Sequence, residues 1–197
     1  MSKPVIIACT GGIGSGKSYV VKAFSCMGIP SYDCDSRAKQ LYYEDKNLLA
    51  KVVEIVGEDI LIDGRLNKKA FAEKIFNNNN LLDAVESVVH PAVLRDFSSW
   101  CSCQNSKLII FESAIYLEKP GLNNLADFVI VVTAPQEQRI ERVMLRDGLP
   151  REAVLARIES QWTDRQRIDK ADYIIETNDR DAIIPQLISI IHKWQQI

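Results

Sequence analysis

A glycine-rich segment near the N-terminus, TGGIGSGKS at residues 10–18, constrains the fold more than any other feature of the sequence. The apolar run Pro4–Cys9 precedes it and the amphipathic segment Lys17–Met27 follows it, which predicts a strand before it and a helix after it. Glycine costs roughly 0.5–1 kcal/mol relative to alanine inside regular structure, so such a cluster needs a reason. The segment fits the pattern G-x-x-x-x-G-K-[ST] in the strand–helix setting that a phosphate-binding loop requires. The sequence therefore predicts that the chain binds nucleotide phosphate.

Each part of this loop has a predicted role in holding a triphosphate. Its glycines let successive N–H groups approach an anion, and the start of the helix adds the partial positive charge of its dipole. Lys17 can reach the β- and γ-phosphates, and the Ser18 hydroxyl can bind Mg²⁺. The residues predicted to contact ATP here are Gly12, Ile13, Gly14, Ser15, Gly16, Lys17, Ser18 and Tyr19.

Composition limits the other classes of function. The chain has 197 residues and a formal net charge of −2 at pH 7, which argues against a dedicated nucleic-acid-binding protein. No apolar stretch approaches the ~20 residues of a membrane-spanning helix. The five cysteines are odd in number, form no C-x-x-C pair and follow no secretory signal, so we expect reduced thiols and a cytoplasmic location. The two histidines are far apart in the sequence, which disfavours a zinc site.

Short apolar runs alternate with longer amphipathic segments along the chain. Continuous apolar runs indicate strands buried on both faces, and strands alternating with helices predict a three-layer α/β fold with a parallel sheet. One helix is expected to begin near Pro135, and another to be capped by Asp179 and to run towards Trp194. The predicted strands are Pro4–Cys9, Ile29–Tyr32, Lys107–Phe111, Phe128–Val132 and Asp172–Glu176.

The pattern changes between residues 36 and 106, where apolar residues recur with helical spacing. We interpret this stretch as a mostly helical insertion beside the sheet, with NNNN at 77–80 as a loop and cap between helices. Residues 1–35 and 107–197 would then form a nucleotide-binding core. The core includes a predicted helical lid at about residues 139–165.

Two carboxylates follow the second predicted strand, in SYDCDS at residues 31–36. Asp33 and Asp35 are two residues apart, so on extended chain both face the same side. The carboxyl ends of parallel strands gather at one edge of the sheet together with the phosphate loop. One carboxylate could orient a Mg²⁺-bound water and the other accept a proton from an acceptor hydroxyl. The alternative is that one of them only caps a helix that starts near Ser36.

Further charged residues are expected near the phosphates. Glu112 stands at the end of the third predicted strand, where it is either a magnesium-side carboxylate or an ordinary loop acid. Arg139, Arg142 and Arg146 share one face of a predicted helix, which the turn RDGLPRE ends. A cationic helix–turn–helix suggests a lid whose Arg142 and Arg146 neutralise charge that develops during transfer. The alternative is a solvated helix face on which these arginines alternate with glutamates.

The remaining motifs favour a small phosphotransferase. The segment NKKA at 67–70 lacks the aspartate of the guanine-reading N-K-x-D motif, and no ABC-type signature is present. The chain is also short for a motor or a transporter subunit. A nucleoside or small-metabolite kinase and a non-catalytic, nucleotide-dependent binding module are the alternatives that this pattern leaves open.

Taken together, the motifs resemble the dephospho-CoA kinase family over nearly the whole chain. ACTGGIGSGKS is similar to that family's opening, YDCD to its D-A-D turn and VESVVHPAV to its helix with a His-Pro pair. RVMLRDGLPREAVLARIESQ resembles its lid, and ADYIIETND its last strand and adenine-side turn. The resemblance implies a P-loop NTPase fold with a helical CoA-side insertion, and a kinase that uses ATP and Mg²⁺ to phosphorylate the ribose 3′-hydroxyl of dephospho-CoA. The expected partner is this small molecule alone, with the chain a monomer or a small homo-oligomer.

The resemblance also implies roles for single residues. Asp35 would be the general base at the 3′-hydroxyl, and Asp33 would support Mg²⁺ or orientation. Lys17 and Ser18 would hold the triphosphate and the metal ion. Residues expected near the acceptor are Thr10, Asp35, His90 and Glu112, and those expected to act from the lid and the adenine side are Arg142, Arg146 and Asn178.

The sequence departs from the family pattern in three places. AIYLE at 114–118 stands where the family has PLLFE, Cys34 replaces the alanine of D-A-D, and Thr177 displaces the asparagine of the adenine-side turn. None of these changes touches the phosphate-transfer residues. Replacing Lys17 by alanine or Asp35 by asparagine is therefore predicted to abolish transfer and to leave the fold intact.

Overall fold

The computed structural model describes residues 3–76, 78–119, 121–122, 124–178 and 180–194. Asp179, the expected helix cap, and Asn77 of the NNNN segment lie outside these residues. The chain forms two compact units, one from residues 1–33 and 105–197 and the other from residues 34–104. In the described part of the chain, no helix has the length and apolarity that a membrane span needs.

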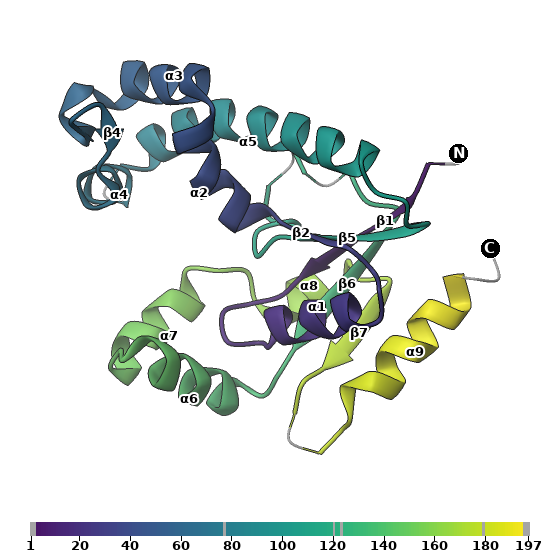
Figure 1. The fold of residues 1–197 in the computed structure, drawn as a ribbon. Coiled ribbons are helices and arrows are strands. Elements are labelled where there is room, and N and C mark those ends of the chain that lie inside the picture. Colours follow the sequence, from purple (N-terminus) through teal and green to yellow (C-terminus); the bar gives the residue numbers. More distant parts are fainter. Residues whose placement is uncertain (1–2, 77, 120, 123, 179, 195–197) are drawn as a thin grey trace. The chain divides into compact units, whose positions relative to one another are not determined.

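The first unit is built on a five-stranded sheet in which every neighbouring pair of strands is parallel. Its strands lie side by side in the order β2-β5-β1-β6-β7 (Figure 1). This arrangement confirms the predicted α/β fold with a parallel sheet flanked by helices. The strands are β1 (Val5–Thr10), β2 (Ser31–Asp33), β5 (Leu108–Glu112), β6 (Phe128–Thr133) and β7 (Tyr173–Glu176).

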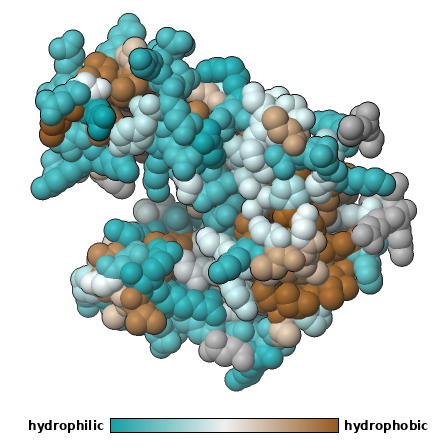
Figure 2. All heavy atoms as spheres, viewed as in Figure 1, coloured by the Kyte–Doolittle hydropathy of each residue, from teal (hydrophilic) through white to brown (hydrophobic). Residues whose placement is uncertain are grey.

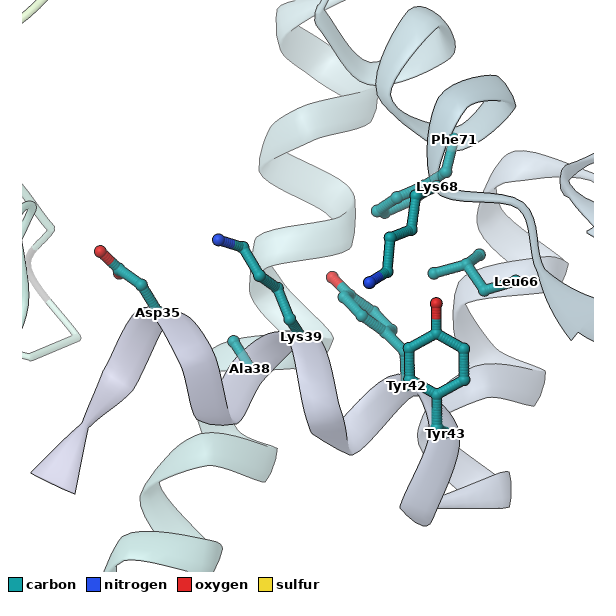
Figure 3. Close-up of a pocket in the computed structure, with 8 residues that line it drawn as sticks. All are labelled: Asp35, Ala38, Lys39, Tyr42, Tyr43, Leu66, Lys68 and Phe71. Atoms are coloured by element: carbon teal, nitrogen blue, oxygen red, sulfur yellow. The ribbon is translucent and has the colours of Figure 1, made fainter. Parts of the chain in front are cut away.

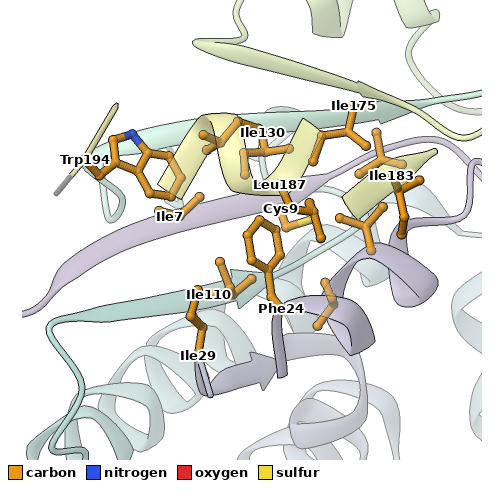
Figure 4. Packing of buried hydrophobic residues seen from close by; sticks show 14 residues of the cluster. Ile7, Cys9, Phe24, Ile29, Ile110, Ile130, Ile175, Ile183, Leu187 and Trp194 are labelled. Carbon is orange, nitrogen blue, oxygen red and sulfur yellow. The ribbon is translucent and has the colours of Figure 1, made fainter. Parts of the chain in front are cut away.

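Helices α1 (Lys17–Cys26) and α9 (Ile183–Trp194) pack on one face of this sheet. Alternate strand residues such as Ile7 and Ile130 meet Phe24 of α1 and Leu187 of α9 in one buried cluster (Figure 4). The other face is also buried, since Ala8 of β1 is fully inaccessible although it points opposite to Ile7. Burial on both faces explains why the strands read as continuous apolar runs.

The outer surface of α9 is less polar than most of the molecule. Figure 2 shows apolar side chains gathered over this helix, and its residues Ile184 and Ile188 are exposed. The remaining helices of the first unit are α6 (Gln136–Asp147), α7 (Arg151–Glu159) and α8 (Asp164–Ile168). Helices α6 and α7 form a hairpin with its own small core of Ile140, Val143 and Val154.

The second unit is mainly helical. It contains α2 (Cys34–Glu44), α3 (Lys46–Val56), α4 (Lys68–Phe76) and α5 (Asn79–Ser102), with a short hairpin of β3 (Leu61–Ile62) and β4 (Arg65–Leu66) between α3 and α4. The long helix α5 begins at the cap Asn78, whose side chain accepts from the Leu81 amide. Arg37 of α2 holds α5 through two hydrogen bonds of 2.9 and 2.6 Å to the Asp96 carboxylate.

The boundary between the units corrects one detail of the sequence analysis. Strand β2 ends at Asp33 and helix α2 begins at Cys34, so Asp33 and Asp35 do not share an extended segment. Asp35 lies in the first turn of α2, where a carboxylate is stabilised by the helix dipole. The prediction that both carboxylates face the same side assumed an extended chain. It is wrong because the helix starts at Cys34, two residues before Ser36.

Candidate active site

The glycine-rich loop connects β1 to α1 and adopts backbone angles that favour glycine. Gly14 and Gly16 have φ of +76° and +86°, in the left-handed region. A Cβ on Gly14 would lie 2.5 Å from the Arg139 carbonyl oxygen, and one on Gly16 would lie 2.7 Å from the Thr177 hydroxyl. The first N–H groups of α1 have no partner within the helix. The loop therefore presents a helix N-terminus to an anion, with its glycines required by close packing behind it.

Lys17 and Ser18, at the start of α1, both contact Glu112 at the end of β5. The Lys17 ammonium forms an ion pair with Glu112 Oε1, and the Ser18 hydroxyl donates to the same oxygen at 3.1 Å. Glu112 is only 6% exposed, so its charge depends on these two partners. The structure thus brings Glu112 directly to the lysine and serine of the loop.

Asp33 adds a second carboxylate at the same edge of the sheet. It is the last residue of β2 and the parallel partner of Glu112 in the register of β2 and β5. Mg²⁺ is usually held by one or two carboxylates together with substrate phosphate oxygens, rather than by a cage of protein ligands. The described residues contain no group of three or more His, Cys, Asp or Glu that could hold a metal alone. The Ser18 hydroxyl and these strand-end carboxylates are oxygen donors of the kind that Mg²⁺ prefers when it arrives with a nucleotide.

Cys9 lies beside Glu112 in the sheet, beneath the loop. Burial raises the pKa of its thiol to about 12, against the opposing effect of the Lys17 charge. The side chain is therefore a neutral thiol near pH 7 and packs as a small apolar group. We therefore expect Cys9 to support the loop by packing and not to act as a nucleophile.

Arg142, on α6, links the loop to the turn after β7. Its guanidinium donates to the Thr177 carbonyl at 2.6 Å and to the Thr177 hydroxyl at 2.9 Å, and it approaches the Gly14 carbonyl at 3.5 Å. The Thr177 hydroxyl in turn donates to the Ser15 carbonyl at 2.6 Å. Arg142 therefore lies beside the loop, and its role at the phosphates stays a prediction.

Arg146, one turn further along α6, has a different environment. Its guanidinium is mostly exposed and pairs with Asp147 at 2.7 Å. This pairing lowers the pKa of the Asp147 carboxyl. The structure does not bring Arg146 to the glycine-rich loop, because its side chain is turned towards the end of α6.

Arg139 is buried beside the loop, a role that the sequence pattern did not predict. It is 4% exposed, its Nε donates to the Ile13 carbonyl at 2.9 Å, and its Nη1 pairs with Asp164 at 2.7 Å. Gln161 holds the same loop residue from the other side by accepting from the Ile13 amide at 2.9 Å. Arg139 therefore fixes the backbone of the loop. Its position one turn before Arg142 on the same helix is the sequence feature that could have predicted this role.

We predict that Arg139→Met lowers the free energy of unfolding by about 2 kcal/mol, because the Ile13 carbonyl and Asp164 lose a buried charged partner. Arg167 stays near Asp164 at 3.6 Å, which limits the loss. Urea denaturation measures the change. The control is Arg151→Met, whose exposed ion pair with Glu137 should contribute far less to the free energy of unfolding. Equal stabilities of the two variants would contradict a supporting role for Arg139.

The remaining predicted residues of the first unit lie around the loop. Thr10 is fully buried, and its hydroxyl donates to the Ala114 carbonyl at 3.2 Å. A cavity of about 380 Å³ lies next to Gly16, and its lining includes Tyr19, Arg142 and Asn178. The Asn178 amide group donates to Asp181 at 2.7 Å, and Tyr19 is 64% exposed. This cavity lies next to the glycine-rich loop, and the binding of a nucleotide base there stays a prediction.

Asp35 and His90 belong to the second unit. Asp35 lines a cavity of about 410 Å³ together with residues of α2, β4 and α4 (Figure 3). His90 is half-buried on α5 and is not among the described residues that line this cavity. A molecule bound in this cavity could therefore contact Asp35, whereas His90 is not part of the described lining.

Comparisons with known proteins find dephospho-CoA kinases that match nearly the whole chain. A protein-family model described as dephospho-CoA kinase matches residues 5–182. A dephospho-CoA kinase of Porphyromonas gingivalis is 39% identical over 189 residues, covering 95% of this chain and 93% of that protein. One of Bacteroides fragilis is 34% identical over 186 residues, covering 94% and 90%. The crystal structure of TT1252 from Thermus thermophilus aligns with a TM-score of 0.85 at 30% identity and covers 98% of both chains.

Proposed function

This chain belongs to the dephospho-CoA kinase family, and we propose that it transfers the γ-phosphate of ATP to the ribose 3′-hydroxyl of dephospho-CoA, giving CoA and ADP. The main support for the proposal is that Lys17 and Ser18 both contact the buried Glu112 at the carboxyl edge of the sheet. A glycine-rich loop, a cation and oxygen ligands at one point are what phosphoryl transfer from ATP requires.

The residues of the loop would bind and orient the donor. The N–H groups at the start of α1 and the Lys17 ammonium would bind the β- and γ-phosphates, so that Lys17 exchanges Glu112 for a phosphate oxygen. Arg142 would stabilise the negative charge that develops in the transition state. The cavity beside Asn178 and Tyr19 would take the adenine.

Ser18 and Asp33 would hold Mg²⁺, with Glu112 beside them. Bound Mg²⁺ would supply charge neutralisation on the phosphate oxygens. Glu112, once released from Lys17, keeps the Ser18 hydroxyl as a hydrogen-bond partner and can orient it.

Asp35 would accept the proton from the 3′-hydroxyl as its oxygen attacks the γ-phosphorus. A general base must come within hydrogen-bond reach of the proton that it removes, and a carboxylate in a cavity of the acceptor-side unit suits this role. The O–P bond to the acceptor forms, the bond to the β-phosphate oxygen breaks, and ADP leaves. The α6–α7 hairpin would act as the lid that excludes water during this step.

A direct assay tests the proposal. The purified chain is incubated with ATP, Mg²⁺ and dephospho-CoA, and the nucleotide products are identified by mass and by migration against authentic CoA. We expect formation of CoA and ADP in equal amounts and loss of activity when the metal is chelated. Faster phosphorylation of a free nucleoside, or ATP consumption that does not depend on any acceptor, would overturn the assignment.

A further inference from the structure

The glycine-rich loop is joined to both ends of the α6–α7 hairpin at one residue, Ile13. The Ile13 carbonyl accepts from Arg139 on α6 at 2.9 Å, and the Ile13 amide donates at 2.9 Å to Gln161, which follows the end of α7. The Ile13 side chain packs against the small core of the hairpin. The conformation of the loop at this residue therefore depends on how firmly Arg139 and Gln161 are held.

Asp164, the first residue of α8, holds Arg139 in place. Its Oδ2 accepts from Arg139 Nη1 at 2.7 Å. Its Oδ1 is buried and has no hydrogen-bond partner within the described part of the chain. This second oxygen lies 3.6 Å from Arg167 Nη1, which is too far for a hydrogen bond. Asp164 thus stands between two arginines and is bonded to one of them.

Arg167 is kept away from Asp164 by a partner from a distant segment. The Arg167 side chain is fully buried, and its Nη2 donates at 2.5 Å to Glu118 in the turn that follows β5. Its Nη1 donates to the Trp162 carbonyl. A buried charge destabilises the fold unless it is paired, so Arg167 needs the Glu118 carboxylate or a substitute for it. The nearest substitute is the free oxygen of Asp164.

The four charges therefore alternate in sign along one path, in the order Glu118, Arg167, Asp164 and Arg139, which ends at the backbone of the loop. We propose that Glu118 and Arg167 are positioning residues for the nucleotide. Their mutual pairing leaves Asp164 to Arg139, so that the loop keeps the conformation in which its N–H groups meet phosphate. The inference rests on the proposed function, because it requires that this loop binds ATP.

A double-mutant cycle tests the proposal, with the affinity for ADP measured by titration calorimetry in the absence of an acceptor. We expect Glu118→Gln to raise the Kd for ADP about fivefold, because the amide keeps an oxygen for Arg167 but loses the charge that strengthens the bond. In an Arg139→Met background the same change should have no further effect, because Asp164 then has no arginine through which to act on the loop. Equal effects in both backgrounds, or no effect in either, would overturn the proposal.

Steady-state kinetics separate positioning of the nucleotide from a general disturbance of the site. Glu118→Gln should raise KM for ATP by a factor similar to that for the Kd of ADP and leave KM for dephospho-CoA unchanged. The matched control is Glu159→Gln, the same change at an exposed glutamate at the end of α7, which should leave both KM values unchanged. An equal rise of both KM values in Glu118→Gln would contradict the proposal.

Hydrogen exchange of backbone amides gives a readout that does not depend on activity. At a temperature well below unfolding, Glu118→Gln should speed exchange of the Ile13 amide and leave the amides of β1 at the parent rate. Faster exchange throughout the sheet would show a loss of global stability and contradict a positioning role. If the unaltered chain binds ADP and makes CoA while Glu118→Gln binds ADP equally well, only this inference fails. If the unaltered chain binds no ADP, the proposed function fails with it.

Discussion

Lys17→Ala is expected to lower kcat for phosphoryl transfer on the order of 10³-fold, measured as CoA formed at saturating ATP and dephospho-CoA. The ammonium group belongs to the first residue of α1 and pairs with Glu112 in the structure, and the proposed function would bring it to the phosphates. In the proposed function it would neutralise charge on the transferring group, and no other side chain of the glycine-rich loop carries a positive charge.

The structure indicates that Lys17→Ala also lowers stability, whereas the sequence predicted an intact fold. Glu112 is buried and depends on Lys17 as its ionic partner, so Lys17→Ala should also reduce the free energy of unfolding by about 3 kcal/mol. The control is Lys17→Ala combined with Glu112→Gln, which removes the unpaired charge. The double variant should recover most of the stability and none of the activity. If the single variant is as stable as the parent, the Lys17–Glu112 pair has no structural role.

Asp35→Asn is expected to lower kcat by about 10²- to 10⁴-fold, because the amide cannot accept the proton of the 3′-hydroxyl. The effect should appear in kcat more than in KM for dephospho-CoA, since the amide keeps the shape of the carboxylate. Asp35 is exposed in the first turn of α2, so the loss of its charge should cost no more than about 1 kcal/mol of stability. Steady-state kinetics at saturating Mg²⁺, with circular dichroism for the fold, measure both effects.

The comparison variant is Asp33→Asn, the same change two residues earlier. We expect it to raise the Mg²⁺ concentration needed for half-maximal activity, because Asp33 stands next to Glu112 in the sheet register. Near-normal turnover of Asp35→Asn together with an inactive Asp33→Asn at saturating Mg²⁺ would transfer the role of base to Asp33.

The sheet and the loop could be predicted from the sequence because both follow from local patterns. Continuous apolar runs such as VIIAC occur where a strand is buried on both faces. Glycines stand before Lys17 at positions with positive φ angles. Such a preference belongs to single residues, so it can be recognised in the sequence. The hairpin of β3 and β4 was missed because two-residue strands carry no periodicity.

The roles of individual arginines could not be separated in the same way. Arg139, Arg142 and Arg146 have equal status on a helical wheel, although Arg139 is buried against Ile13 and Arg146 is exposed beside Asp147. The difference arises from which segments pack against α6, and those segments are distant in the sequence. Glu118 gives a second case, because its partner is the fully buried Arg167 on α8, 49 residues away.

The hydroxyl of Thr177 connects the glycine-rich loop to helix α6. It gives its proton to the Ser15 carbonyl and receives one from Arg142, so its orientation is fixed by both. A movement of the turn after β7 would therefore be transmitted to the backbone of the glycine-rich loop. If the nucleotide binds as proposed, this side chain would couple the segments at its two ends, and Thr177→Val, which keeps the shape but lacks the hydroxyl, would remove that coupling.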